Sequence, residues 1–170
     1  MKFDIFEYFI FKSLIHLQTN GKDNDLSILK CVKLCFFFST VEDEEGDSLL
    51  ETFNDIYAMP LGHVEASIYS AMKNDNYRFF SFDRVKTSLK VDRLSFDNFD
   101  QEIKIIVDRK FQILLTKNPN LLFMSAYDLV ELSHQWFSWR YFYSEAKKNS
   151  LLKMKIPTEV VKTENKIYLF

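Results

Sequence analysis

The side chains of this sequence that could perform chemistry are 3 histidines and 2 cysteines. A histidine acts as a general base only when a nucleophile or substrate group lies within hydrogen-bond reach and a further group orients its ring. No Gly-x-Ser-x-Gly, His-x-x-x-His or acidic pair accompanies His134 in the sequence. We therefore expect no catalytic residue, and an enzyme that uses His134 or His63 stands only as an alternative.

The histidines are instead expected to have structural roles. His134 lies on the flank of a predicted helix, where a hydrogen bond to the backbone would hold its ring. His63 follows a glycine and is expected to be an exposed turn residue. His16 lies on the first predicted helix, and we assign it no role.

The two cysteines, Cys31 and Cys35, are one turn apart on a predicted helix. A helix does not bring two such sulfurs into disulfide geometry. No further soft ligand is spaced to complete a zinc site with them. We expect reduced, buried thiols, no metal and no cofactor, and the reducing compartment that such thiols favour is the cytoplasm.

The elements that must position these residues are mostly helical. The sequence has only 3 Gly and 3 Pro, which is few for a fold with many β-turns. Apolar periodicity predicts helices over residues 3–18, from Asp25 or Ser27 to 41, about 63–73, 97–117 and 126–139. Residues 77–94 are rich in β-formers and allow a small hairpin. The fold class predicted is mainly α, a compact bundle-like single domain over 1–170 with its core at about 5–160.

Local signals mark where these helices begin and end. Asp97 is the expected N-cap of the fourth helix, and Ser125 with Asp128 resembles a capping box for the fifth. The stretch from Met59 to Gly62 should break the chain, with Pro60 fixing a turn and Gly62 allowing a positive φ or a close backbone approach. Both are therefore expected to be structural.

Lys33 is a lone charge on a predicted helix that is otherwise largely apolar. One interpretation packs its stem against the core and leaves the ammonium at the surface. The other is a buried pair with a carboxylate, or a contact with a binding partner. The sequence leaves both open.

An aromatic run indicates an interaction surface. Residues 136–143 contain two tryptophans, two phenylalanines and two tyrosines, and one helix cannot bury all of them on a single face. Part of the run must be exposed or covered by a partner or a second copy of the chain. The candidate contacts are Trp136, Phe137 and Trp139 of this run, Tyr69, because tryptophan and tyrosine dominate binding hot spots, and the lone charge Lys33.

Charge and hydropathy exclude two other classes of partner. The net charge of −2 differs from the basic footprint of a general nucleic-acid binder. The apolar N-terminal stretch carries Asp4, Glu7 and Lys12, and is too short and too charged to span a bilayer. We expect no membrane association and regard nucleic acid as an improbable partner.

Three segments together resemble the Panacea domain, also called the SocA-like antitoxin family. The first is Leu26–Leu34, similar to the family's second helix with its Leu-Ser-x-Leu-Lys pattern. The second runs from Ala58 through Pro60 and Gly62 to Tyr69, and the third is Leu129–Gln135 with Trp139. Their order and spacing both fit, and the resemblance covers about residues 5–160.

The resemblance implies an antitoxin of a type II toxin–antitoxin system. Members of the family are typically encoded beside a toxin and neutralise it, either by direct binding or as a proteolytic adaptor that delivers the toxin to an AAA+ protease. The family pairs with many unrelated toxins, so the cognate protein toxin is not named by the sequence. The motif residues Pro60, Gly62 and His134 are expected to be structural within this family.

A DNA-binding helical regulator is the alternative function. The predicted helices at 97–117 and 126–139 are joined by a short turn and could be taken for a helix-turn-helix. The outward face of the second carries Asp128, Glu131 and Gln135, which is unsuited to phosphate contact.

Overall fold

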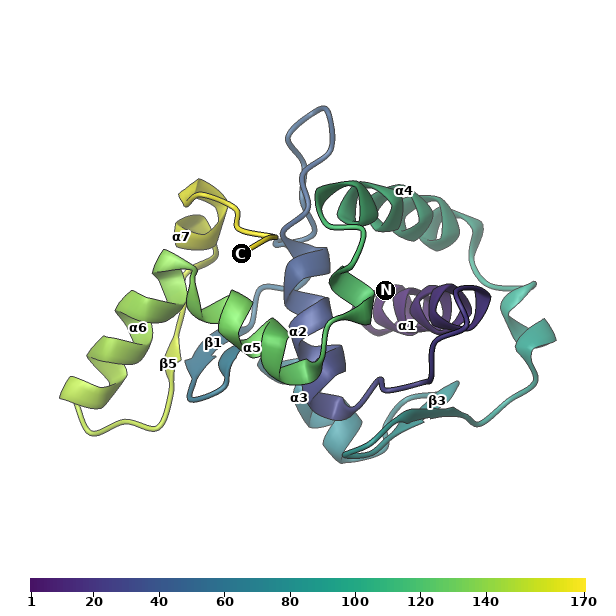
Figure 1. Cartoon of the computed structure of the whole chain (residues 1–170), viewed down its shortest axis with the longest axis horizontal. Helices are drawn as coiled ribbons and strands as arrows, with labels where there is room; N and C mark the ends of the chain where they lie inside the picture. The colour runs from purple at the N-terminus through teal and green to yellow at the C-terminus, as the bar shows by residue number, and fades with distance from the viewer.

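The central element is the helix α2 (Ile28–Ser39), around which the other elements pack (Figure 1). The computed structural model describes all residues from 1 to 170. Every residue of α2 from Lys30 to Ser39 is buried, because its apolar side chains cover almost the whole circumference. The Ser27 side chain accepts the Lys30 N–H and caps the helix, as its residue type predicts.

The fold is mainly α, as predicted, with a minor sheet. The other helices are α1 (Lys2–Thr19), α3 (Ala66–Lys73), α4 (Gln101–Lys117), α5 (Ala126–His134), α6 (Phe137–Lys148) and α7 (Thr158–Thr163), with short 3-10 helices η1 (Arg93–Phe96) and η2 (Leu121–Phe123). The strands are β1 (Ile56–Met59), β2 (Gly62–Glu65), β3 (Phe80–Phe82), β4 (Thr87–Leu89) and β5 (Met154–Lys155). No helix is both long enough and apolar enough to cross a membrane.

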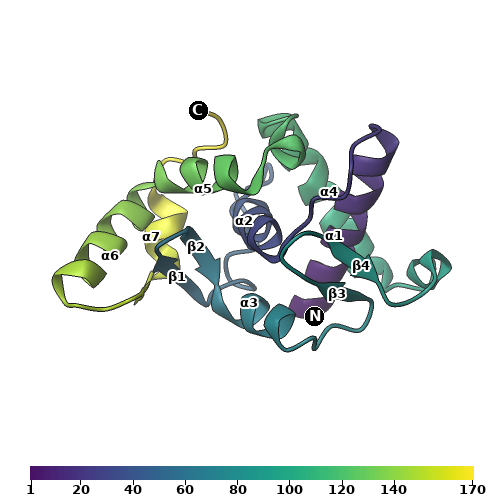
Figure 2. The same ribbon diagram turned by 60° about the horizontal axis from the view of Figure 1, so that its bottom comes forward.

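A small antiparallel sheet replaces the start of the third predicted helix. Its strand order is β2–β1–β5, with Met59 paired with Gly62 and Ile56 paired with Glu65. The expected chain break is therefore a tight hairpin turn between two strands (Figure 2). The helix α3 starts at Ala66 rather than near 63, because the Glu65 side chain accepts the Ile68 N–H and caps it there. The predicted hairpin within 77–94 is confirmed as β3–β4.

Two predicted helix boundaries need correction. The helix α4 begins at Gln101 rather than 97, because Asp100 and not Asp97 accepts the first free N–H groups. The predicted helix over 126–139 is two helices: α5 ends at His134, and α6 begins after Trp136, whose backbone is extended. The extended residue allows the indole of Trp136 to enter the core. The capping box of Ser125 and Asp128 is confirmed.

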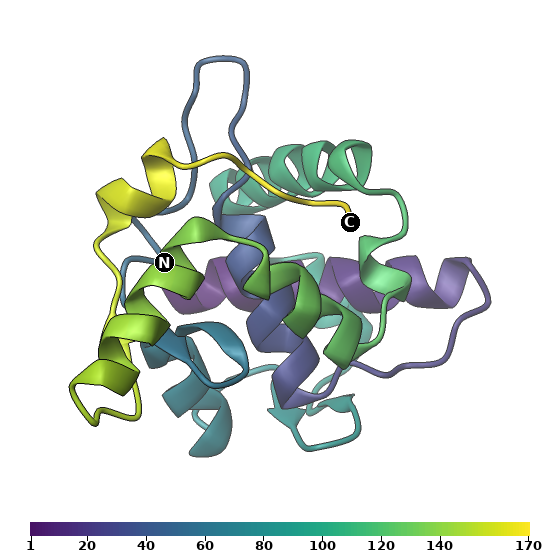
Figure 3. The same cartoon turned by 60° about the vertical axis from the view of Figure 1, so that its left-hand side comes forward.

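Aromatic rings fill the core between α1, α4 and the β3–β4 hairpin. The ring of Phe9 stacks on Phe38 at 4.2 Å between centroids, and the ring of Phe11 stacks on Phe96 at 4.0 Å. Figure 3 shows α4 lying above α1 with α2 crossing both. The Cys31 and Cys35 thiols are free and buried, as predicted.

The segment after α7 crosses the end of α2 as a strap, which we define as residues 164–168 (Figure 3). The Trp136 indole N–H donates to the Ile167 carbonyl at 2.8 Å. The Tyr168 hydroxyl lies 3.1 Å from the Thr40 hydroxyl, and the Asn118 side chain donates to the Tyr168 carbonyl. The strap therefore connects the ends of α2 and α4 to the start of α6.

Candidate functional site

The three segments that carry the family resemblance meet at a buried polar junction. The Lys33 ammonium of α2 donates to the His63 carbonyl of β2 at 2.6 Å. The Ser133 hydroxyl of α5 accepts the His63 N–H at 3.1 Å and lies 2.8 Å from His63 Nδ1. All three side chains are buried. Hydrogen bonds between residues far apart in sequence therefore fix α2, the β1–β2 hairpin and α5 against one another.

His63 is the centre of this junction. The prediction that it would be an exposed turn residue is wrong. Its ring is fully buried and stacks on Phe36 at 3.8 Å between centroids. Its Nε2 lies 2.8 Å from the hydroxyl of Ser138 on α6, so both ring nitrogens have a serine partner. Burial, followed by the nearby Lys33 charge, lowers the pKa of His63 well below its ordinary value.

The junction continues to the C-terminal strap through Ser138. Its N–H donates to the Glu164 carboxylate at 2.9 Å, so Glu164 satisfies a free N–H at the start of α6. Burial raises the pKa of Glu164, and its other carboxylate oxygen is buried without a hydrogen-bond partner.

Lys33 fits neither interpretation of the sequence. Its side chain is 0% exposed, so the ammonium does not reach the surface. No carboxylate pairs with it, and the His63 carbonyl is the only hydrogen-bond acceptor that it has. Burial lowers the pKa of Lys33 to about 7. Because the side chain is enclosed, Lys33 is not part of a surface that a partner could contact in this structure.

Gly62 lies where the backbone of β2 passes closest to the junction. Its φ is +93°, in the region that favours glycine. A Cβ there would lie 2.5 Å from the Ser133 hydroxyl and 3.0 Å from the Lys33 ammonium nitrogen. The chain passes there only because the residue has no side chain.

The turn of the hairpin is held from outside by α5 and α6. The Trp139 indole N–H donates to the Met59 carbonyl at 2.8 Å, and the His134 ring stacks on Trp139 at 3.7 Å. The expected backbone contact of His134 is a loose one: burial lowers the pKa of the ring, the Pro60 backbone raises it as a hydrogen-bond partner, and Nε2 has no partner at ordinary hydrogen-bond distance. Stacking positions this ring instead, close to the turn that contains Pro60.

The aromatic run at 136–143 divides between core and surface. Trp136 is fully buried, with its ring against Phe36. The prediction that it lies on an interaction surface is therefore wrong. Trp139 is partly buried. Phe137 and Tyr141 are each about half exposed and stack on one another at 5.6 Å. Part of the run is therefore exposed, as its density predicted.

A second exposed region of apolar side chains is a groove beside the polar junction. Its volume is about 550 Å³, and its lining residues come from α2, the β1–β2 hairpin, α3, the β3–β4 turn and the start of α5. The groove is lined by Ile28, Leu29, Val32, Met59, Pro60, Leu61, Val64, Tyr69, Lys73, Arg84 and Tyr127. Leu61 is 46% exposed and Tyr127 is 70% exposed. Of the sequence candidates, Tyr69 lies in this groove and Phe137 does not.

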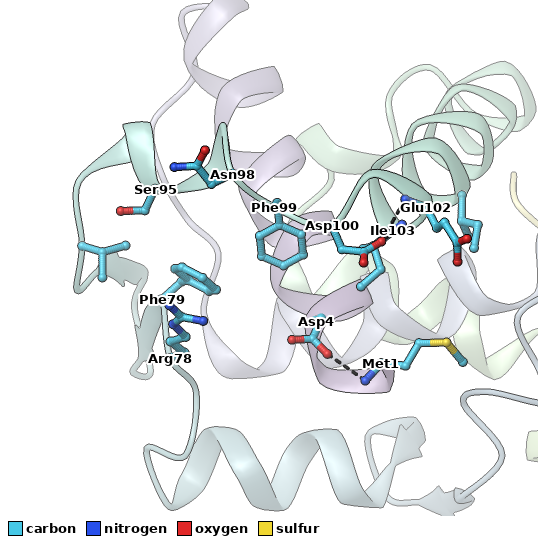
Figure 4. A pocket seen from close by; sticks show the side chains of 12 residues that line it. Met1, Asp4, Arg78, Phe79, Ser95, Asn98, Phe99, Asp100, Glu102 and Ile103 are labelled. Carbon is cyan, nitrogen blue, oxygen red and sulfur yellow. Dashed lines mark hydrogen bonds and ion pairs between the residues drawn. The ribbon is translucent and has the colours of Figure 1, made fainter.

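A further hollow of about 730 Å³ lies between the start of α1 and the start of α4 (Figure 4). Of its charged groups, only Glu102 has no partner within the chain. Asp4 pairs with the Met1 amino group at 2.7 Å, the Arg78 guanidinium lies over the Phe79 ring, and Asp100 caps α4. This hollow therefore offers no free set of polar groups that converge on one point.

The chemistry available to the buried junction is limited by its enclosure. Ser138 and His63 are in contact as a nucleophile and base would be, yet both are fully buried and neither lines the groove or the further hollow. A general base needs access to a substrate group. The junction is therefore structural. No group of three or more histidine, cysteine, aspartate or glutamate side chains is placed to hold a metal ion.

Several residues of this region were missed by the sequence analysis. Ser133, Ser138 and Glu164 gave no local signal, because their partners are distant in sequence. Tyr127, a large aromatic side chain beside a helix cap, could have been suspected as an exposed contact. Lys73 and Arg84 belong to separate elements and become neighbours of one groove only in the fold. Comparisons of this chain with models of protein families, with curated proteins and with solved structures found no match.

Proposed function

We propose that this chain is the antitoxin of a type II toxin–antitoxin system and neutralises a cognate protein toxin by binding it directly. One observation carries the proposal. The three Panacea-like segments pack into one unit, and two of them, on α2 and on the β1–β2 hairpin with α3, form most of the apolar groove. Residues that carry the resemblance thus line a surface of the kind that binds proteins.

The composition of the groove supports a protein partner. All of its eleven lining residues except Lys73 and Arg84 are apolar or aromatic. Exposed tyrosines such as Tyr69 and Tyr127 are typical of binding hot spots, because a large rigid ring gains contact area at a small entropic cost. The exposed pair of Phe137 and Tyr141 on α6 is a second surface that a toxin or another copy of the chain could cover.

The proposed location is the cytoplasm, where a toxin would act on the cell that makes it. The reduced state of Cys31 and Cys35 fits a reducing compartment.

Rescue is the test of this function. The open reading frame adjacent to this gene is expressed from an inducible promoter, alone and together with this chain, and the tagged pair is purified. We expect growth to stop when the neighbour is expressed alone, to resume in the presence of this chain, and the two proteins to co-purify. A harmless neighbour, or toxicity that persists beside soluble antitoxin, contradicts the proposal.

The rescued cells also separate direct binding from action as a proteolytic adaptor. Under direct binding the toxin accumulates in a complex and its half-life does not fall. An adaptor would shorten the half-life of the toxin, and rescue would then require the AAA+ protease. A pulse-chase measurement of the toxin, in hosts with and without that protease, distinguishes the two modes.

The alternative of a DNA-binding regulator has weaker support. The helices α4 and α5 are adjacent in sequence, but the exposed residues of α5 include Asp128 and Glu131, which would repel phosphate. Gel-shift measurements on the DNA upstream of the gene decide this point. A specific shift by this chain alone, together with failure of the rescue, would favour the regulator.

A further inference from the structure

The groove carries positive charge that no residue of the chain neutralises. Lys73 at the end of α3 and Arg84 in the β3–β4 turn are exposed and line the groove, and neither forms a salt bridge within the chain. No aspartate or glutamate lines it. The carboxylate of the neighbouring Asp83 accepts the N–H groups of Val85 and Lys86 and is held in its own turn. In a chain of net charge −2, the groove is a locally cationic, apolar recess.

We propose that the groove binds a segment of the toxin in which carboxylates flank a large apolar side chain, an inference that rests on the proposed function. The side chains of Val32 and Val64 are buried and form an apolar floor. An apolar side chain seated there leaves water, which is the main driving force for such contacts. Carboxylates beside it would face Lys73 and Arg84, which accelerates the encounter and selects its orientation.

The charges and the shape favour this occupant over the acidic loop of a second copy of the chain. The most acidic stretch of the chain, residues 42–47, supplies carboxylates but contains no apolar side chain. This stretch could therefore pair with the cations of the groove but would leave the apolar side chains of its floor without a contact. A nucleic acid is disfavoured too, because phosphate binding relies on many cations and this groove has two beside an apolar floor.

The test uses two matched pairs of variants of the whole chain. Lys73→Glu/Arg84→Glu reverses the charge of the groove, and Arg93→Glu/Lys117→Glu changes the net charge equally at exposed cations outside it. Tyr127→Ala removes an exposed ring from the groove, and Tyr141→Ala removes one from α6. All six residues are exposed, so circular dichroism and thermal unfolding should show folded proteins for each variant.

Two probes are titrated by fluorescence anisotropy and by pull-down. The first is the toxin that the rescue identifies. The second is a short fluorescein-labelled peptide with leucines flanked by glutamates, compared with a peptide in which lysines replace the glutamates. We expect the groove reversal to weaken binding of the toxin and of the glutamate peptide by at least about tenfold, with a smaller salt dependence. The control reversal should change the affinity by less than about twofold, and Tyr127→Ala should weaken binding more than Tyr141→Ala.

The outcomes separate this inference from the proposed function. If the toxin is neutralised but its binding depends on Tyr141 and is indifferent to Lys73 and Arg84, the antitoxin function stands and the groove inference is overturned. If no toxin is neutralised, the function fails, and equal binding of the two peptides overturns the groove chemistry as well. A dimer in light scattering that the groove reversal abolishes would place a second copy in the groove and also overturn it.

Discussion

The two sides of α2 are built in different ways. On the side of α1 and α4, stacked aromatic rings such as Phe9 on Phe38 fill the space next to α2, and the buried Lys110 bonds only at the edge, to the Val41 carbonyl and Asp43. On the side of β2 and α5, the contacts are hydrogen bonds between buried polar atoms of Lys33, His63 and Ser133. Ring packing can adjust to small changes in position, and its stability depends chiefly on the volume filled. A buried polar contact requires each partner in its place, because an unpaired group costs the full desolvation.

The polar contacts on one side of α2 account for the position of the groove. Met59 and Val64, which line it, belong to the hairpin that the polar junction fixes, and Val32 lies beside Lys33 on α2. A binding surface benefits from fixed positions, since a preorganised site loses less entropy on association. The aromatic side supplies stacked rings of the core, and the polar side determines the geometry of the surface.

The largest expected effect is on the aromatic side. Phe9→Ala removes a fully buried ring and should lower the free energy of unfolding by about 3–5 kcal/mol, since the cavity cannot fully collapse. Urea unfolding followed by circular dichroism measures this. The matched change Phe3→Ala, at a ring that is 45% exposed, should cost far less. Equal losses of unfolding free energy at the two positions would mean that the stability of this side does not depend on the buried ring volume.

On the polar side, Gly62→Ala should be the most damaging small change. The added methyl group meets the Ser133 hydroxyl at 2.5 Å and imposes a strained φ, so we expect a loss of about 2–4 kcal/mol. Gly46→Ala is the control, because Gly46 also has a positive φ but nothing lies within 4 Å of its added Cβ. Its loss should be about 1 kcal/mol, from the backbone conformation alone. If both variants lose the same amount in urea unfolding, the close approach at Gly62 is not significant.

The polar side should also make stability depend on pH through Lys33. Its pKa is about 7 in the folded chain and near 10.5 when exposed, so the unfolded state binds more protons between these values. The free energy of unfolding should therefore rise with pH above 7, by up to about 1.4 kcal/mol per pH unit from this group. Lys33→Met should remove that rise and stabilise the protein at pH 7.

Other groups limit the window for this measurement. Burial lowers the pKa of His63, so stability is lost as pH falls below 6.5, and burial raises the pKa of Cys31 to about 12, which opposes the rise at high pH. Urea unfolding between pH 6.5 and 8.5 is therefore the cleanest range. Lys30→Met, at a buried lysine paired with Asp25, is the control. If Lys30→Met also removed the rise of the free energy of unfolding with pH, Lys33 would not be the source of that rise.

The smallest effect concerns one hydroxyl. Ser133→Ala leaves His63 Nδ1 and the His63 N–H without their partner and should cost about 1–3 kcal/mol. Ser144→Ala, at an exposed serine of α6, should be nearly neutral. Differential scanning calorimetry of the two variants measures the difference. A neutral Ser133→Ala would indicate that the junction tolerates rearrangement as the aromatic side does.

The sequence predicted what depends on local pattern. The helices α1 and α4 are long and strongly periodic, so their existence followed from apolar spacing. The capping box at Ser125 is a short-range signal and was found. The start of α4 was misplaced because Asp97 and Asp100 are both suitable caps, and only tertiary packing selects between them.

The site was harder to predict because its contacts are long-range. His63 followed a glycine and looked like a turn residue, whereas its buried ring bonds to Ser133 and Ser138, which lie 70 and 75 positions away. The break before Trp136 has no proline or glycine to mark it. The chain bends there because the indole gains more by entering the core than the helix would gain by continuing. Of the predicted contact residues, Tyr69 and Phe137 are at the surface, and Lys33 and Trp136 are inside.

The contacts of the strap must form late in the folding of the chain. Its contact between Tyr168 and Thr40 joins residues 128 positions apart, so a very long loop must close before that contact forms. Contacts of such separation form late in folding, since the entropy of closure is lost before any contact compensates for it. During synthesis, the indole N–H of Trp136 therefore lacks its partner, the Ile167 carbonyl, until the residues of the strap have been made. With Trp139→Phe, which leaves Trp136 as the sole tryptophan, the fluorescence emission should shift last in refolding and report the final step in assembling the chain.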